Sequence, residues 1–155
     1  MKRMWMAALV AASLVPASLA LACGKSCDCN HDKTAAAAKP AAKQAWKTVS
    51  VAEVSKLSAA KQAQLFDANT AKFRAENGII PGATLLSSSS GYELKDLPAQ
   101  KDAKLVFYCA NTKCMASHAA AERAVGAGYT DVAVMPEGLL GWKAAGQKTS
   151  PVPKS

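Results

Sequence analysis

The chain has 155 residues, of which 50% are hydrophobic and 19% are charged. A chain of this size and composition can form one domain with its own core, which excludes a protein that is disordered throughout. The formal net charge of +8 favours anionic ligands. The lysines are nevertheless spread singly along the sequence, without an arginine cluster or interleaved aromatic residues, so we expect no binding to nucleic acid.

The first 22 residues have the pattern of a secretory signal peptide. Lys2 and Arg3 precede an apolar stretch, and residues 20–22, Ala-Leu-Ala, satisfy the small-residue rule for cleavage. Two alternatives stay open: an uncleaved membrane anchor, and a lipoprotein acylated on Cys23, although Ala20 stands where a lipoprotein signal usually has leucine. We therefore predict export to the bacterial periplasm, and attachment to the membrane through the N-terminus stays open.

Residues 23–46 form a cysteine-containing head and an alanine- and lysine-rich linker, and we predict that they are disordered. The head places three thiols and one imidazole close together in the sequence: Cys23, Cys27, Cys29 and His31. These groups could bind zinc or copper(I). Their spacing differs from the usual pair of cysteines separated by two residues, so we predict no metal and no cofactor and keep this set only as an alternative.

Residues 47–148 alternate between strand-like and helix-like segments joined by short connections. The strands are expected at residues 48–51, 64–67, 83–86, 105–108 and 131–135. The helices are expected at residues 50–57, 70–76, 117–127 and 139–145, with one helical turn within 92–97. This alternation predicts an α/β fold in which a central, mostly parallel sheet of about five strands is covered by helices on both faces. Residues 149–155 are predicted to be a disordered tail.

Cys109 ends the apolar segment at residues 104–108 and precedes a polar loop, residues 110–116, and a predicted helix. Ligands of parallel α/β sheets bind beyond the carboxyl ends of the strands, which is where Cys109 falls. We expect N–H groups of the loop and the N-terminus of the helix to converge on the Cys109 sulfur and favour its thiolate. This pattern makes Cys109 a candidate nucleophile or sulfur carrier, although a buried, inert cysteine is the simpler alternative.

Five segments, taken in order, resemble the rhodanese-like domain family over roughly residues 47–147. They are residues 65–69 (Leu-Phe-Asp-Ala-Asn), 78–83 (Gly-Ile-Ile-Pro-Gly-Ala), 106–109 (Val-Phe-Tyr-Cys), 119–132 (from Ala-Ala to Gly-Tyr-Thr-Asp-Val) and 136–142 (Pro-Glu-Gly-Leu-Leu-Gly-Trp). The chain departs from the family pattern with Asn69 for arginine, Ile79 for histidine and Glu137 for glycine. The loop after Cys109 is also about two residues longer than is usual in the family and lacks its arginine.

The resemblance implies a sulfurtransferase that carries sulfane sulfur as a persulfide on Cys109 and moves it from a donor such as thiosulfate to a thiol or cyanide. The partner would then be a small sulfur-containing anion or a thiol. The loop that surrounds the substrate and the persulfide would comprise Ala110, Asn111, Thr112, Lys113, Cys114, Met115, Ala116 and Ser117. Within it, Lys113 is a candidate for attracting an anionic donor, and Ser117 is a helix cap, a hydrogen-bond partner of the sulfur, or both.

Two alternatives to sulfur transfer stay open. Cys114 is either a resolving thiol, which would close a disulfide with Cys109 in a thiol–disulfide redox protein, or a residue that packs the first helical turn. The missing loop arginine is also consistent with a catalytically inactive rhodanese fold that serves as a binding module. A phosphatase is disfavoured, because no residue of the loop replaces the arginine that would hold phosphate.

Overall fold

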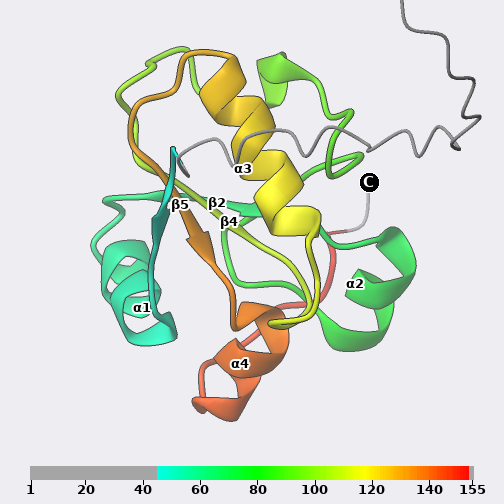
Figure 1. The fold of residues 1–155 in the computed structure, drawn as a ribbon. Helices are drawn as coiled ribbons and strands as arrows, with labels where there is room; N and C mark the ends of the chain where they lie inside the picture. Colours follow the sequence, from blue (N-terminus) through cyan, green and yellow to red (C-terminus); the bar gives the residue numbers. More distant parts are fainter. Residues whose placement is uncertain (1–44, 154–155) are drawn as a thin grey trace, which may run out of the picture. The chain divides into compact units, whose positions relative to one another are not determined.

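A computed structural model describes residues 45–153 of the chain (Figure 1). The predicted signal peptide and almost all of the cysteine-containing head and linker lie outside these residues, so those predictions stay predictions. Among the described residues, no helix is long and apolar enough to cross a membrane. The part of the chain that resembles a known family, roughly residues 47–147, lies inside the described range.

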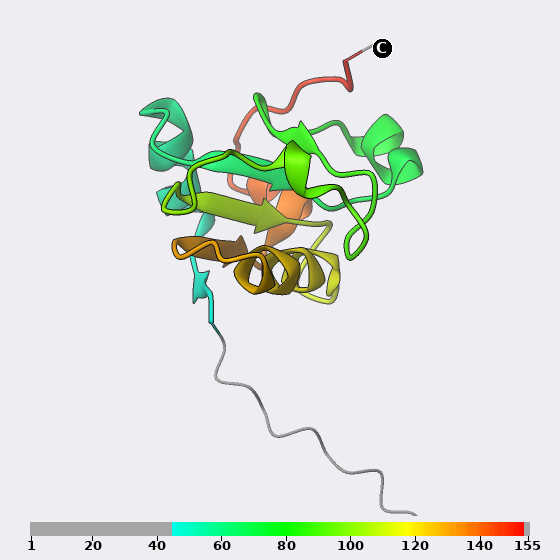
Figure 2. The same cartoon turned by 90° about the horizontal axis from the view of Figure 1, so that it is seen from above.

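The five strands form one parallel sheet in the order β1-β5-β4-β2-β3. They are β1 (Lys47–Thr48), β2 (Gln64–Asp67), β3 (Thr84–Leu85), β4 (Leu105–Tyr108) and β5 (Val132–Met135). In Figure 2 the arrows of β2 and β4 point the same way. The prediction of about five mostly parallel strands is confirmed. β4 lies at the centre, and all of its residues are buried, as is typical of a strand covered on both faces.

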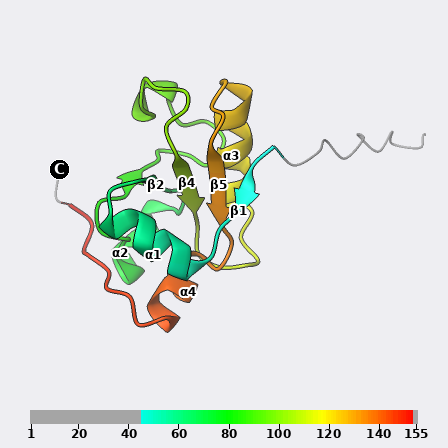
Figure 3. The same cartoon turned by 90° about the vertical axis from the view of Figure 1, so that its left-hand side faces the viewer.

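The helices are α1 (Val51–Ala59), α2 (Ala71–Asn77), α3 (Ala116–Gly126) and α4 (Gly138–Ala144), with a short 3-10 helix at Leu94–Asp96. α1 begins where it was predicted, because the Ser50 side chain accepts a hydrogen bond from the Glu53 amide at 3.3 Å. α2 ends at Gly78, as predicted, where φ is 78°, a value that glycine adopts at no steric cost. Figure 3 shows α1 and α4 in front of the strands and α3 behind them, so helices cover both faces of the sheet.

Two hydrophobic clusters pack on opposite faces of the sheet, because successive side chains of a strand point to opposite sides. Phe107 and Cys109 belong to the cluster that contains the buried alanines of α3. Val106 and Tyr108 belong to the other cluster, together with residues of α1 and α4. The small alanine side chains allow α3 to pack close to the sheet. The alternation along β4 therefore places the Cys109 side chain on the face that α3 covers.

The segment after α4 continues the fold further than predicted. Ser150 pairs with Ile79 through two backbone hydrogen bonds, both 2.9 Å long. The pairing needs a glycine at position 78, since a Cβ there would lie 2.8 Å from the carbonyl oxygen of Ser150. The prediction of a disordered tail from residue 149 is therefore wrong for Ser150. No local sequence pattern predicts the pairing of Ser150 with Ile79, because the two residues are 71 positions apart in the chain.

Candidate active site

The structure brings three predicted site residues into contact at the carboxyl end of β4: Cys109, Cys114 and Ser117. Cys109 directly follows β4, Cys114 lies in the loop, and Ser117 lies in the first turn of α3. Cys109 and Ser117 are fully buried, whereas Cys114 is half-buried. The other loop residues that were predicted to form the cradle are exposed or half-buried: Ala110, Asn111, Thr112, Lys113, Met115 and Ala116.

The Cys109 sulfur faces hydrogen-bond acceptors rather than a ring of loop amides. Its thiol lies 3.0 Å from the carbonyl oxygen of Cys114, to which it donates, and 3.3 Å from the Ser117 hydroxyl. The carbonyl oxygen of Asn111 lies 4.0 Å away. Carbonyl oxygens stabilise a protonated sulfur and repel a thiolate, so these contacts favour the neutral thiol.

Asn111 explains why two of the loop amides point away from Cys109. The Asn111 side-chain oxygen accepts from the Lys113 amide at 3.0 Å, and the Asn111 carbonyl accepts from the Cys114 amide at 3.0 Å. The prediction that loop N–H groups converge on the Cys109 sulfur is therefore wrong for these two groups. This role of Asn111 was not predicted, although asparagine commonly closes turns in this way and its position in a polar loop was a usable signal.

Burial raises the pKa of the Cys109 thiol above its ordinary value of 9.0, and the neighbouring Cys114 side chain raises it further. The hydroxyl and the amide of Ser117 act in the opposite direction, because both can donate a hydrogen bond to a thiolate. Burial prevails, so Cys109 is protonated near neutral pH. The predicted low pKa of Cys109 is therefore wrong for the protein in this conformation.

Cys114 has the surroundings that the sequence predicted for Cys109. Its partial burial acts to raise the pKa of the thiol, but the neighbouring Cys109 side chain and the backbone of Ala110 and Ala116 act in the opposite direction. Together these neighbours lower the pKa of Cys114 below its ordinary value of 9.0. Cys114 is therefore the more ionised of the two thiols near neutral pH. The order of residues in the loop could not show which cysteine the amides would reach.

Ser117 contacts the sulfur but does not cap the helix. The cap position of α3 is Met115, which makes no side-chain cap bond, and Ser117 is the second residue of the helix. The Ser117 hydroxyl is therefore free to face Cys109. The prediction of a sulfur contact is confirmed, and the prediction of a helix cap is wrong.

The start of α4 holds the backbone on which Cys109 stands. The Leu139 amide donates to the Cys109 carbonyl at 2.8 Å, and the Leu140 amide donates to the Ala110 carbonyl at 3.0 Å. This close approach requires Gly138, where φ is 62° and a Cβ would lie 2.4 Å from the Cys109 carbonyl oxygen. The site is thus built from three segments: the end of β4, the first turn of α3 and the first turn of α4.

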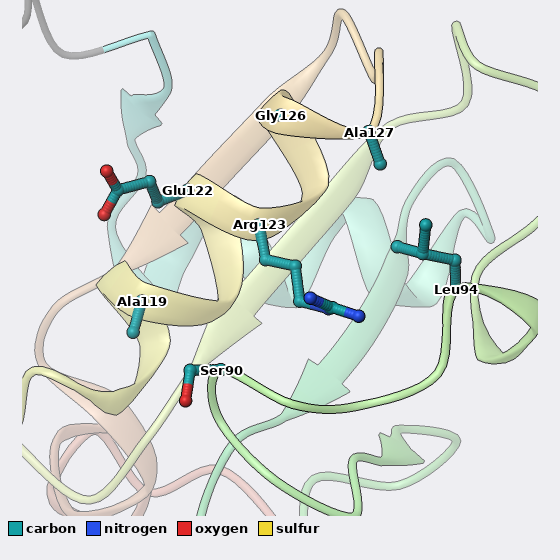
Figure 4. A pocket seen from close by; sticks show the side chains of 7 residues that line it. All are labelled: Ser90, Leu94, Ala119, Glu122, Arg123, Gly126 and Ala127. Atoms are coloured by element: carbon teal, nitrogen blue, oxygen red, sulfur yellow. The ribbon is translucent and has the colours of Figure 1, made fainter.

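A hollow of about 470 Å³ lies along α3, but neither thiol lines it (Figure 4). Its walls are formed by Ser90, Leu94, Ala119, Glu122, Arg123, Gly126 and Ala127. Figure 4 shows the Arg123 side chain extending from α3 toward the segment that carries Leu94. Arg123 Nε donates to the Tyr92 carbonyl at 3.0 Å, so this side chain ties the two segments together. We therefore interpret the hollow as a result of how these two segments pack, and we do not assign it to the site that contains the two thiols.

Within residues 45–153, no group of three or more histidine, cysteine, aspartate or glutamate side chains is placed to hold a metal ion. The alternative metal ligands of the head lie outside this range: Cys23, Cys27, Cys29 and His31.

Iodoacetamide is expected to modify Cys114 before Cys109 near neutral pH. The pKa of Cys114 is lowered and that of Cys109 is raised, so the thiolate fraction is larger at Cys114, by about tenfold for each unit that separates the two pKa values. Peptide mass spectrometry of samples quenched at successive times measures both rates. In urea-unfolded protein the two thiols should react alike. Faster labelling of Cys109 in the folded protein would show that its sulfur is ionised and accessible after all.

Comparisons with known proteins agree with this architecture. The sequence of residues 50–145 matches the rhodanese-like domain family. A Rhodopseudomonas palustris protein of unknown function, described as a possible tyrosine phosphatase, is 25% identical with a TM-score of 0.55, over 68% of this chain and 85% of that one. The human single-domain sulfurtransferase TSTD1 is 27% identical with a TM-score of 0.50, over 63% of this chain and 95% of that one.

The single-domain sulfurtransferase RDL2 of Saccharomyces cerevisiae is 22% identical with a TM-score of 0.54, over 68% of this chain and 94% of that one. No match is found among functionally curated proteins. The matched segment begins at the cap of α1 and ends after α4, so it contains Cys109, Cys114 and Ser117. The chain therefore belongs to the rhodanese-like domain family.

Proposed function

We propose that the chain is an exported sulfurtransferase that carries sulfane sulfur as a persulfide on Cys109. The main support is the position of Cys109, which follows the central strand of a rhodanese-like domain and contacts Ser117 and Cys114 at the carboxyl edge of the sheet. The human and yeast single-domain sulfurtransferases have the same fold. Cys109 would bear the sulfur, and the loop 110–117 would surround it.

The reaction would start from the thiolate of Cys109, after its proton has passed to water. The thiolate attacks the outer sulfur of thiosulfate, and a bond forms between these two sulfurs. The sulfur–sulfur bond of thiosulfate breaks, and its electron pair leaves with sulfite. A thiol or cyanide then attacks the outer sulfur of the persulfide, which frees the Cys109 thiolate. One sulfane sulfur has then moved between two nucleophiles, and the protein is unchanged.

The loop supports a small anionic or thiol partner. Lys113 is exposed beside Cys114, and its charge would attract an anionic donor toward the two thiols. The Ser117 hydroxyl, 3.3 Å from the Cys109 sulfur, can donate to an anionic sulfur. Residues 110–117 contain no arginine, so a phosphate ester would lack the bidentate partner that phosphatases of this kind need.

The location of the protein is part of the proposal. The signal-like pattern of residues 1–22 supports a protein that acts in the periplasm, either free or attached to the membrane by its N-terminus. Detection of the protein in periplasmic and membrane fractions, with the mass of its N-terminus, would distinguish cleavage, acylation on Cys23 and retention of the leader.

The decisive experiment is sulfur loading of the purified full chain. Thiosulfate alone should transfer one sulfur atom per chain, and peptides blocked with iodoacetamide at early times should carry it on Cys109. Addition of cyanide should then release thiocyanate. Absence of added sulfur at every time point, together with no hydrosulfide and no thiocyanate, would leave the rhodanese fold as a binding module, and sulfur found solely on Cys23, Cys27 or Cys29 would refute the role of Cys109.

A further inference from the structure

We propose that Cys114 is a resolving thiol that expels the outer sulfur of a Cys109 persulfide as hydrosulfide and closes a Cys109–Cys114 disulfide. This inference rests on the proposed function, because it requires a persulfide on Cys109. It adds a second activity to sulfur transfer, the reduction of sulfane sulfur by a pair of thiols inside one loop.

The geometry places the attacking group beside the atom that it must attack. In a persulfide the inner sulfur is Cys109 Sγ, and this atom lies 3.0 Å from the Cys114 carbonyl oxygen, so the two cysteines are in contact across the loop. These two cysteines are free thiols, and they are the cysteines that the described residues contain. Closing the disulfide requires the Cys114 side chain to turn toward Cys109 Sγ until the two sulfurs form a bond of about 2 Å, which is a change within the loop.

The loop divides the two roles between the two cysteines. Cys109 lies fully buried at the end of β4, whereas Cys114 is half-buried in a loop whose neighbouring residues are exposed. The Asn111 turn fixes the Cys114 backbone over Cys109, because it accepts from both the Lys113 and the Cys114 amides. A fixed inner thiol and a more accessible outer thiol form the arrangement that thiol–disulfide exchange requires.

The ionisation of the pair agrees with this division. The Cys109 side chain and the backbone of Ala110 and Ala116 lower the pKa of Cys114, so a larger share of Cys114 is thiolate near neutral pH. Thiolate is the attacking species in thiol–disulfide exchange. A persulfide contains the same sulfur–sulfur bond as a disulfide, so a thiolate can attack it in the same way. Cys114 is therefore equipped to attack the Cys109 persulfide.

The step balances in atoms and electrons. The Cys114 thiolate attacks Cys109 Sγ, a bond forms between the two cysteine sulfurs, and the bond from Cys109 Sγ to the outer sulfur breaks. The outer sulfur leaves with the electron pair of the broken bond as hydrosulfide and goes from oxidation state −1 to −2, while the Cys114 sulfur goes from −2 to −1 and the Cys109 sulfur stays at −1. A dithiol from solution returns the disulfide to two thiols and becomes a disulfide itself.

The test uses the full chain with C23S, C27S and C29S, so that Cys109 and Cys114 are the two thiols left. The protein is mixed with thiosulfate without oxygen, and hydrosulfide, protein mass and disulfide linkage are followed in time. We expect up to one equivalent of hydrosulfide per chain together with a Cys109–Cys114 disulfide, and continued release once a small dithiol is added. A sample without thiosulfate should form no disulfide.

The matched variant adds Cys114→Ser to the same background. Its Cys109 persulfide should last at least about tenfold longer and release no hydrosulfide in the absence of added thiol. If no sulfur adds to Cys109 even in this variant, the proposed function itself is overturned. If the persulfide forms in both chains and decays at the same rate without a disulfide, the resolving role is overturned and the proposed function stands. Sulfur found on Cys114 instead of Cys109 would also overturn this division of roles between the two thiols.

Discussion

Cys109→Ser is expected to slow the transfer of sulfur from thiosulfate to cyanide by about a thousandfold or more. The change removes the atom that carries the sulfur, and the groups that are left can only hold a donor near an acceptor. Serine is smaller than cysteine and can still bond to Ser117 in the same buried space, so the fold should be retained. The initial rate of thiocyanate formation measures the effect, and circular dichroism checks the fold.

The matched control is Cys27→Ser, which makes the same chemical change outside residues 45–153. This variant should form thiocyanate at the rate of the unchanged chain. A Cys109→Ser variant that keeps its rate would remove Cys109 from the reaction. Equal losses in both variants would point to a reaction that involves the head rather than the end of β4.

The dependence of the rate on pH gives a second signature of Cys109. Burial raises the pKa of this thiol above 9.0, so its thiolate fraction is small near neutral pH and grows about tenfold with each pH unit below the pKa. Persulfide formation should therefore accelerate steadily as the pH rises from neutral toward 9.0. A rate that is already constant near neutral pH would indicate a nucleophile with a lowered pKa, which is the condition of Cys114.

The central part of the fold could be predicted because its signals are local. β4 and β5 are continuous apolar segments, and a parallel strand buried on both faces has that pattern. Ser50 stands three residues before Glu53, which marks the start of α1. The edge strands β1 and β3 are shorter than predicted, with two residues each, because each of them pairs with one neighbour only.

The details of the site could be predicted less well because they depend on three-dimensional contacts. The position of Cys109 follows from the end of β4, and its contact with Ser117 follows from the strand–loop–helix order. The direction of each loop amide depends instead on the Asn111 turn, and the burial of Cys109 depends on how closely α3 packs. Sequence order therefore located the two thiols correctly but assigned the lowered pKa to Cys109 instead of Cys114.

The contacts of Arg74 could not be predicted from the sequence either, because the residues that it binds lie outside its own helix, α2. Its side chain is 7% exposed and reaches from α2 to the end of β2, where Arg74 Nε donates to Asp67 Oδ1 at 3.1 Å. Arg74 Nη2 also donates to the carbonyls of Asp67, at 2.7 Å, and Leu86, at 2.8 Å. Asp67 is fully buried, so its carboxylate has no water to replace the guanidinium. Asp67 also pairs with Tyr108, the residue before Cys109, so this ion pair supports the edge that carries the thiols.

Arg74→Met is therefore expected to lower the free energy of unfolding by about 3–5 kcal/mol, because the buried Asp67 carboxylate loses its cationic partner and keeps the Asn69 amide, 2.7 Å away, as a donor. The control is Lys104→Met, which removes an ion pair in which Lys104 Nζ lies 2.7 Å from Asp131 Oδ2. Both side chains of this pair are about 30% exposed, so the change should lower the free energy of unfolding by about 1 kcal/mol or less. Adding Asp67→Asn to Arg74→Met should recover part of the loss. Urea denaturation measures all three variants. If Arg74→Met costs no more than Lys104→Met, distance rather than burial sets the strength of these pairs, and the carboxyl edge beside Cys109 must be held by its backbone hydrogen bonds alone.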